Sequence, residues 1–190
     1  SKIRKTYAKQ LVKRITDALI DLNFLDVRFE IEFKEMEEPG ESGKDEICFL
    51  ISTNPGLPLK ALGSVASGGE LSRIMLAIKA VMADKDEVGT LIFDEIDTGI
   101  SGRTAQMALI ARNHQLLCIT HLAQIAAMAD HHYIIEKKPA YSKTVTNIGL
   151  LGEEESIAEL ARILGGAKIT DTVLESAREM KELAKNTKKY

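Results

Sequence analysis

The feature that most constrains the fold is a short apolar run, Gly89-Thr-Leu-Ile-Phe93, which ends in two carboxylates, Asp94 and Glu95. A continuous apolar run of this length is typical of a strand buried on both faces of a parallel sheet. A second such run, 115–119, follows after a helical pattern over 104–111. The alternation of strand and helix from residue 89 onward predicts an α/β fold with a mostly parallel sheet flanked by helices.

The rest of the C-terminal half continues the same alternation. We expect a helix over 122–128, a strand over 132–135, a polar turn over 139–144 and a last strand over 145–151. Two amphipathic helices, 156–164 and 171–185, close the chain on either side of Gly165-Gly166.

The N-terminal quarter has a different pattern. Apolar residues recur about every four positions over 2–24, which predicts an amphipathic helix. The run Val27-Arg-Phe-Glu-Ile-Glu-Phe33 alternates strictly between apolar and charged residues, as a half-buried strand does. A polar turn over 35–45 and a second strand over 47–51 complete an antiparallel hairpin, and Asn54-Pro-Gly-Leu-Pro58 then forms a loop before the next helix.

Composition excludes several classes of protein. With 190 residues, 45% of them hydrophobic, and a net charge of −3, the chain is neither disordered nor uniformly basic. It has no run of about 20 apolar residues, so no membrane span is expected. Two isolated cysteines, Cys48 and Cys118, favour a reduced, cytoplasmic protein. The chain begins without Met in a helical pattern, which suggests part of a longer protein.

The strongest local motif is Ser67-Gly68-Gly69-Glu70, just before a helical pattern that extends to about residue 83. Ser67 and Glu70 have the spacing of a helix capping box. Two glycines at a helix N-terminus expose backbone N–H groups in a positive field, which suits a bound phosphate. An ordinary capped helix after a flexible turn is the simpler interpretation of this tetrapeptide.

The two carboxylates after the run at 89–93 stand where open α/β sheets bind ligands, at the carboxyl end of a strand. One carboxylate at that edge can hold Mg²⁺, directly or through water. The neighbouring carboxylate can then orient or deprotonate an attacking water. A solvated pair of acids at a strand end is the alternative.

His121 follows the strand at 115–119, and Asp97 lies in the turn after Glu95. Both are predicted at the same sheet edge as Asp94, which makes His121 a candidate contact for a γ-phosphate. A lone histidine of this kind is more often a satisfied structural residue.

Taken in order, these motifs resemble the second half of an ABC-type ATPase head. In that family Ser67-Gly-Gly-Glu70, Leu91–Glu95, Asp97 and Thr120-His121 match the signature motif, Walker B, the D-loop and the switch histidine. Longer runs, 65–77, 93–102 and 119–130, are similar to SMC-like ATPases of bacterial DNA double-strand-break repair. The similarity covers essentially the whole chain.

The resemblance implies an ATP hydrolase that sandwiches ATP and Mg²⁺ between two heads. It implies that Ser67, Gly68 and Gly69, in one motif with Glu70, contact the γ-phosphate bound on a second copy. By the same resemblance, Asp94 holds Mg²⁺ through water, and Asp97 links the two sites across the dimer.

The same resemblance gives catalytic roles to two residues. Glu95 positions and activates the hydrolytic water, and His121 touches the γ-phosphate. DNA is the implied partner, in the bacterial cytoplasm at the nucleoid and with no membrane.

One part of an ABC head is missing from the sequence. The phosphate-binding pattern G-x-x-x-x-G-K-[ST] is absent, and its nearest approximation, Gly40-Glu-Ser-Gly43-Lys44-Asp45, has the wrong spacing and lies between two strands. In SMC-like proteins that Walker A lobe is N-terminal. Residues 1–25 are then the helix returning from a coiled coil, and 26–190 the C-terminal lobe of the head. We expect the chain alone to be inactive or nearly so.

Two other interpretations stay open. The chain could come from another SMC-like or transport-linked ATPase head, although the leading helix and the turn at 97–102 argue against a transporter. It could also be a non-hydrolysing α/β interaction module that uses the sheet edge to bind a partner. Basic residues cluster at 2–13 and 181–189, and the sequence does not decide whether either cluster binds DNA.

Overall fold

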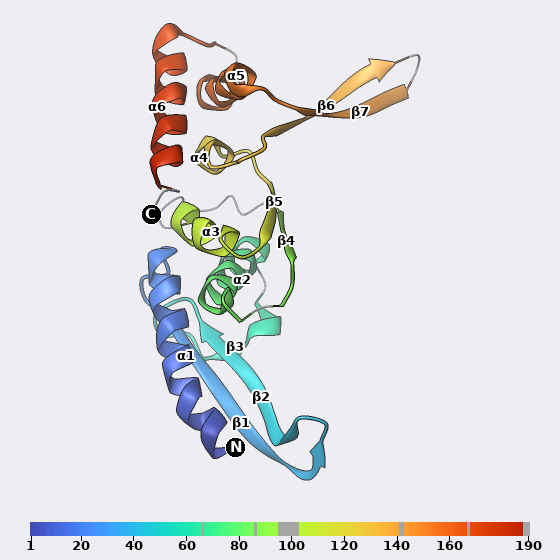
Figure 1. The fold of residues 1–190 in the computed structure, drawn as a ribbon. Coiled ribbons are helices and arrows are strands. Elements are labelled where there is room, and N and C mark those ends of the chain that lie inside the picture. The colour runs from blue at the N-terminus through green and yellow to red at the C-terminus, as the bar shows by residue number, and fades with distance from the viewer. Residues whose placement is uncertain (66, 86, 95–102, 141–142, 167, 188–190) are drawn as a thin grey trace. The chain divides into compact units, whose positions relative to one another are not determined.

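The computed structural model describes residues 1–65, 67–85, 87–94, 103–140, 143–166 and 168–187. The chain divides into two compact units, Ser1–Ile119 and Thr120–Tyr190 (Figure 1). Each unit contains helices and strands, and the first contains a parallel strand pair, so the predicted α/β class is confirmed.

The first unit begins with helix α1 (Lys2–Asp21), which lies alongside the hairpin of β1 (Arg28–Gly40) and β2 (Gly43–Ser52) (Figure 1). The predicted alternation is confirmed, because Phe29 is buried while Glu30 and Glu32 are exposed. Phe29 packs against Phe49 of β2, with ring centroids 5.6 Å apart. The short strand β3 (Lys60–Ala61) adds to β2, and a 3₁₀ turn, η1 (Leu62–Ser64), follows.

The polar turn predicted over 35–45 is wrong, because the strands run through most of it. Only residues 41 and 42 lie between β1 and β2, and Gly43 has a φ of +96°, which favours glycine. The pairing shifts register between Glu35 and Gly40, and this irregularity accommodates Pro39. The segment Gly40–Asp45, which partly resembles a phosphate-binding loop in sequence, is therefore a hairpin turn, as predicted.

Helix α2 (Gly68–Met82) packs against α1 and against α3 (Arg103–Ala111). The strands β4 (Thr90–Asp94) and β5 (Gln115–Ile119) pair in parallel, with Leu91 opposite Leu116 and Phe93 opposite Cys118. The fully buried large side chains of this unit come from the three helices and the turn after α1: Ile15, Leu19, Leu22, Ile74, Leu76 and Ile110.

The second unit contains α4 (Ala123–Ala127), the antiparallel pair β6 (Tyr133–Ala140) and β7 (Lys143–Leu150), α5 (Glu153–Gly165) and α6 (Asp171–Thr187). Its core lies among α4, α5 and α6, while the hairpin extends away from these helices (Figure 1). The turn predicted over 139–144 is wrong, because both strands extend into it. Helix α5 begins at Glu153 rather than at the predicted Ser156.

A polar cluster joins the start of the hairpin to both long helices. Lys181 of α6 donates to Ser156 Oγ of α5 at 2.6 Å, and that oxygen lies 2.8 Å from His132 Nδ1. Because an ammonium group only donates, the Ser156 hydroxyl is free to donate its own proton to a neutral His132. Ser156 is only 2% exposed, so this cluster is part of the packed interior.

Leu160 tests the core of the second unit, because its side chain is fully buried among the helices. Leu160→Ala should lower the free energy of unfolding by about 2–5 kcal/mol, through lost burial and the cavity left behind. Urea unfolding followed by circular dichroism measures this, with Leu164→Ala as the control, since Leu164 lies on the same helix and is 40% exposed. Equal losses in both variants would contradict this core.

Stability should also fall on acidification because of His132. Burial lowers the pKa of His132 from 6.5, the Lys181 ammonium lowers it further, and Glu159 opposes them weakly. The unfolded chain therefore takes up the proton first, and stability is lost as pH falls below about 6.5. The free energy of unfolding, measured at pH 7.5 and at pH 5.5, should decrease less in His132→Gln than in the wild type. The neighbouring His131→Gln should keep the wild-type loss, and identical pH dependence in all three proteins would sink the explanation.

Candidate functional site

The predicted capping motif forms the start of α2. Ser67 is the N-cap, with extended backbone angles (φ −93°, ψ 118°), and its side chain accepts a hydrogen bond from the Glu70 N–H at 3.4 Å. Ser67 and Gly68 are exposed, and a Cβ added at Gly68 would meet no atom within 4 Å. The turn therefore leaves open space beside a helix N-terminus, which is the arrangement that binds anions.

Arg73, which the sequence analysis did not select, holds this turn against the end of α1. Its Nε donates to the Gly69 carbonyl and its Nη1 to the Leu22 carbonyl, both at 3.4 Å. The guanidinium also lies over the Phe24 ring, 4.3 Å from its centroid. No motif in the sequence marks this arginine, because two of its partners, the Leu22 carbonyl and the Phe24 ring, lie about 50 residues away in the sequence.

Asp94 ends β4, as predicted, and its position pairs with Ile119 at the end of β5. Phe93 before it is 8% exposed, whereas Asp94 itself is exposed. The structure brings Ser67, Gly68, Gly69 and Glu70 together in one turn, and no described hydrogen bond joins Asp94 to that turn. Glu95 and Asp97 lie outside the described residues.

His121 lies in the second unit, next to its first residue, and is exposed. The neighbouring Thr120 accepts a hydrogen bond from the Leu122 N–H at 3.0 Å through its Oγ1. That bond stabilises the turn that leads into α4 and therefore restrains the backbone at His121, which lies between the two bonded residues.

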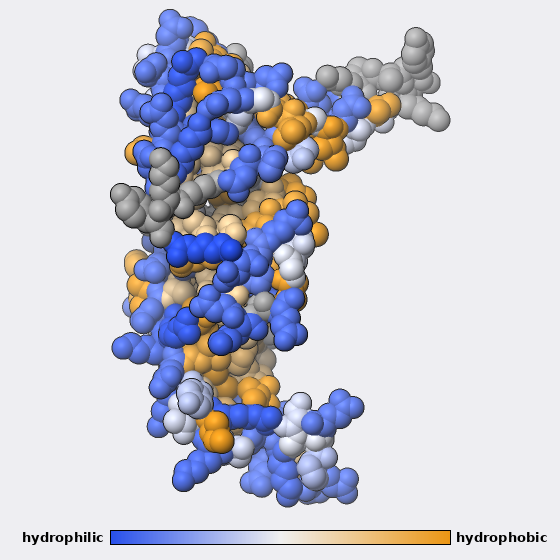
Figure 2. Space-filling model, in the orientation of Figure 1, coloured by the Kyte–Doolittle hydropathy of each residue, from blue (hydrophilic) through white to orange (hydrophobic). Residues whose placement is uncertain are grey.

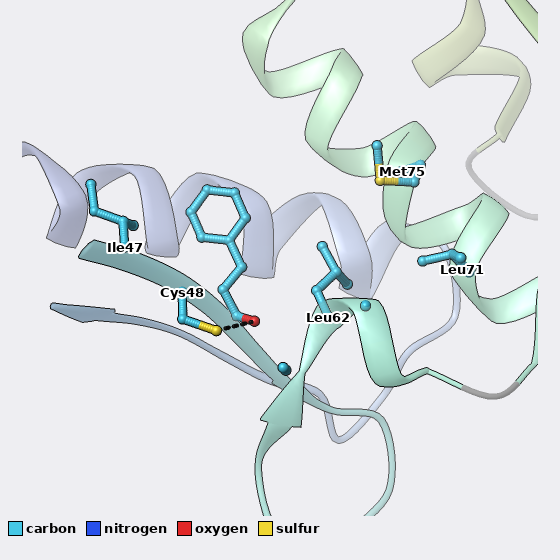
Figure 3. A pocket seen from close by; sticks show the side chains of 8 residues that line it. Ile47, Cys48, Leu62, Leu71 and Met75 are labelled. Atoms are coloured by element: carbon cyan, nitrogen blue, oxygen red, sulfur yellow. Dashed lines mark hydrogen bonds between the residues drawn. The ribbon is translucent and has the colours of Figure 1, made fainter. Parts of the chain in front are cut away.

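An apolar groove lies beside the start of α2, with a volume of about 600 Å³. Figure 3 shows it between β2, the segment at Leu62 and the face of α2 that carries Leu71 and Met75. Its lining contains no charged side chain: Ile47, Cys48, Phe49, Ala61, Leu62, Gly63, Leu71 and Met75. A phosphate has no counter-charge there, so the exposed turn at Ser67–Glu70 is the better anion site.

Neither cysteine forms a disulfide. Burial raises the pKa of the Cys118 thiol to about 11, so it stays protonated at neutral pH and is a poor nucleophile.

Among the described residues, no three His, Cys, Asp or Glu side chains are grouped as metal ligands. In the same part of the chain, every helix is too short or too polar to cross a bilayer.

Comparison with solved structures defines the class of fold. The chain is similar to the Smc head domain with a coiled coil and joint from Pyrococcus yayanosii, with a TM-score of 0.54 and 22% identity over 83% of this chain and 29% of that one. The Smc head domain from Pyrococcus furiosus with an extended coiled coil, bound to the C-terminal domain of ScpA, gives a TM-score of 0.51 and 21% identity, over 85% and 39% of the two chains. The fold of this chain is similar to part of an SMC head domain.

Comparison with protein sequences gives relatives of higher identity. The chain is 43% identical to DNA repair protein RecN of Halalkalibacterium halodurans over 98% of its own length, and 43% identical to RecN of Bacillus subtilis over 99%. Identity to RecN of Vibrio cholerae is 42% over 94%. The predicted resemblance to RecN-type, SMC-like proteins is confirmed. The chain spans about one third of these relatives, 34%, 36% and 33% respectively. No family model matches it.

The cap at Ser67 can be tested by stability. Ser67→Ala removes the acceptor for the Glu70 N–H and should cost about 1 kcal/mol of folding free energy. Ser72→Ala, one turn into the same helix, is the matched control and should be neutral or slightly stabilising, because alanine favours helix interiors. Urea unfolding measures both, and a Ser67→Ala variant as stable as the Ser72→Ala variant would contradict the cap.

Proposed function

We propose that the chain is the C-terminal part of an SMC-like ATPase head, which binds and hydrolyses ATP at the interface of two heads and acts in DNA double-strand-break repair and recombination. The observation that carries the proposal is the similarity to RecN proteins along nearly the whole chain. The relatives' name supports the repair role, and we place the protein in the bacterial cytoplasm at the nucleoid.

The start of α2 supports a role in phosphate binding. A γ-phosphate held by a second copy would accept hydrogen bonds from Ser67 and from the backbone of Gly68 and Gly69. The open space at Gly68 and the field of a 15-residue helix fit that ligand. Glu70 would stabilise the helix end rather than touch the phosphate, because its carboxylate repels an anion.

The exposed carboxylate of Asp94 fits Mg²⁺, which prefers few protein oxygens together with water and phosphate. Bound Mg²⁺ would neutralise charge on the phosphates. Glu95 would orient the attacking water and accept its proton, His121 would contact the γ-phosphate, and Asp97 would link the two sites. Phosphoryl transfer depends mainly on such positioning and charge neutralisation.

Two uncovered apolar surfaces support a partnership with an N-terminal Walker A lobe. In the first unit, Ile92, Leu117 and Ile119 share one face of the β4–β5 pair and are 68%, 48% and 52% exposed. In the second unit, apolar side chains gather on one face of the β6–β7 hairpin (Figure 2): Tyr133, Ile135, Ile148 and Leu150. Parallel strands are normally covered on both faces, so we propose that the N-terminal lobe covers the exposed face of the β4–β5 pair. The hairpin is antiparallel, and its apolar patch is proposed as a second contact because exposed apolar patches mark interaction surfaces.

Mixing the chain with the N-terminal lobe of a RecN relative tests the proposal. The chain alone should hydrolyse ATP negligibly, and the mixture should show Mg²⁺-dependent hydrolysis. In the mixture, Glu95→Gln should retain ATP binding and head pairing while turnover falls at least about 100-fold, since the general base is lost. Phosphate release measures turnover, and analytical ultracentrifugation with ATP measures pairing.

The outcomes separate the competing functions. A mixture that binds ATP but never hydrolyses it would favour the non-hydrolysing interaction module, and unchanged turnover in Glu95→Gln would remove Glu95 from the catalytic role. Glu87→Gln, at an exposed acid before the same strand, is the matched control and should leave turnover unchanged.

A further inference from the structure

The two clusters of basic residues differ in whether they have partners within the fold. On α6, Arg178 pairs with Glu154 at 2.9 Å, and Lys185 pairs with Glu153. Lys181 donates to the buried Ser156. The basic side chains of this helix are therefore used to hold α5 and α6 together, and their charge is largely neutralised there.

The basic residues of α1 are arranged differently. Lys2, Lys5, Lys9 and Lys13 follow one another at spacings of three, four and four, so they form a row along one face of the helix, the α1 lysine row. All four are exposed, and Lys2, Lys5 and Lys9 line one shallow concave surface with Ser1 and Thr6.

Nothing in the described structure neutralises this row. The first acidic residue of α1 is Asp17, and none of the four lysines makes an ion pair with a described residue. Lys5 lies over the Phe33 ring, 5.8 Å from its centroid, which orders the side chain without removing its charge. At 1.5 Å per residue, the row extends over about 16 Å.

We propose that the α1 lysine row binds the phosphate backbone of double-stranded DNA without reading sequence. The proposal rests on the proposed function, which makes DNA the partner, and it adds the surface. A straight row of charges on a rigid helix matches a linear polyanion, and lysines acting on phosphates carry no base specificity. An anionic membrane fits less well, because Ile3 and Tyr7 are the exposed large apolar side chains of the segment 2–13 and are too few to insert a helix face into a bilayer, while Ile15 and Leu19 are buried.

Binding of a fluorescent 20-base-pair duplex, measured by anisotropy on the whole chain without ATP, tests the surface. If four lysines neutralise four phosphates, log K should fall with log salt at a slope of about −3.6, or roughly 150-fold between 50 and 200 mM NaCl. The variant with Lys2, Lys5, Lys9 and Lys13 changed to Gln should lose most of both affinity and slope.

The control variant changes four exposed lysines elsewhere to Gln, with the same change in net charge: Lys60, Lys85, Lys137 and Lys168. It should keep the wild-type slope, and circular dichroism should show that both variants are folded. Equal losses in both variants, a row variant with wild-type binding, or a wild-type chain that binds anionic vesicles instead of duplex would each overturn the proposal.

A second measurement separates this proposal from the proposed function. Without DNA, the row variant mixed with the N-terminal lobe should hydrolyse ATP as fast as the wild type. If duplex binding depends on the row but the mixture never hydrolyses ATP, the surface stands and the ATPase assignment fails. If hydrolysis is restored but the row does not affect duplex binding, the surface fails alone.

Discussion

The parallel pairing of β4 and β5 is the constraint on which the candidate site depends. Parallel pairing places the carboxyl end of one strand, Asp94, level with the carboxyl end of the next, Ile119. The sequence predicts these strands to be buried on both faces, and that prediction is wrong for the described residues. The described residues cover this pair on one face, where Phe93 is buried, and leave Ile92 and Leu117 in water on the other. Among the described residues, nothing covers the second face of this pair. This exposed face supports the proposal that hydrolysis requires an additional N-terminal lobe.

Helices α1, α2 and α3 are linked to one another by side chains that donate to carbonyls near helix ends, which lack partners within the helix. Gln106 of α3 donates to the Ala18 carbonyl in the last turn of α1 at 2.7 Å. Arg14 of α1 donates to the Val81 carbonyl near the end of α2 at 3.1 Å. Arg73 completes the set at Leu22. The buried Gln106 Oε1 has no hydrogen-bond partner among the described residues, so burying this side chain carries a desolvation cost. The bond to Ala18 therefore fixes how the helices are oriented more than it adds to the net folding free energy.

The sequence predicts the features that depend on the local spacing of apolar residues. It does not predict the features that depend on a paired strand or a packed helix. The helices and the β4–β5 pair follow from apolar spacing, and the Ser67 cap from residue types three apart. The turns at 35–45 and 139–144 were predicted too long, because strand pairing continues through polar residues that alone favour turns. The pattern predicts Ser156 as the start of α5, but Gly152 is the N-cap, its N–H donates to the Glu155 carboxylate, and Ser156 is buried beside Lys181. Arg73 has no local signal, because its partners at Leu22 and Phe24 are distant in the sequence.

The chain has a net charge of −3, but the pairing of opposite charges differs between its two units. In the second unit, acids at the start of α5 meet bases of α6, so opposite charges cancel at contact distance. In the first unit, α1 has six Lys and Arg against two Asp, while the segment 28–52 has eight acids against three bases. That acidic hairpin lies alongside α1, yet the described ion pairs reach it only from the first turn of the helix, as between Arg4 and Asp45. Exposed charges that do not touch are screened by salt and gain little from each other, so the hairpin does not satisfy the lysines. Four exposed ammonium groups without described ion pairs would release condensed counterions when they meet a row of phosphates, and this favours an anionic partner outside the fold.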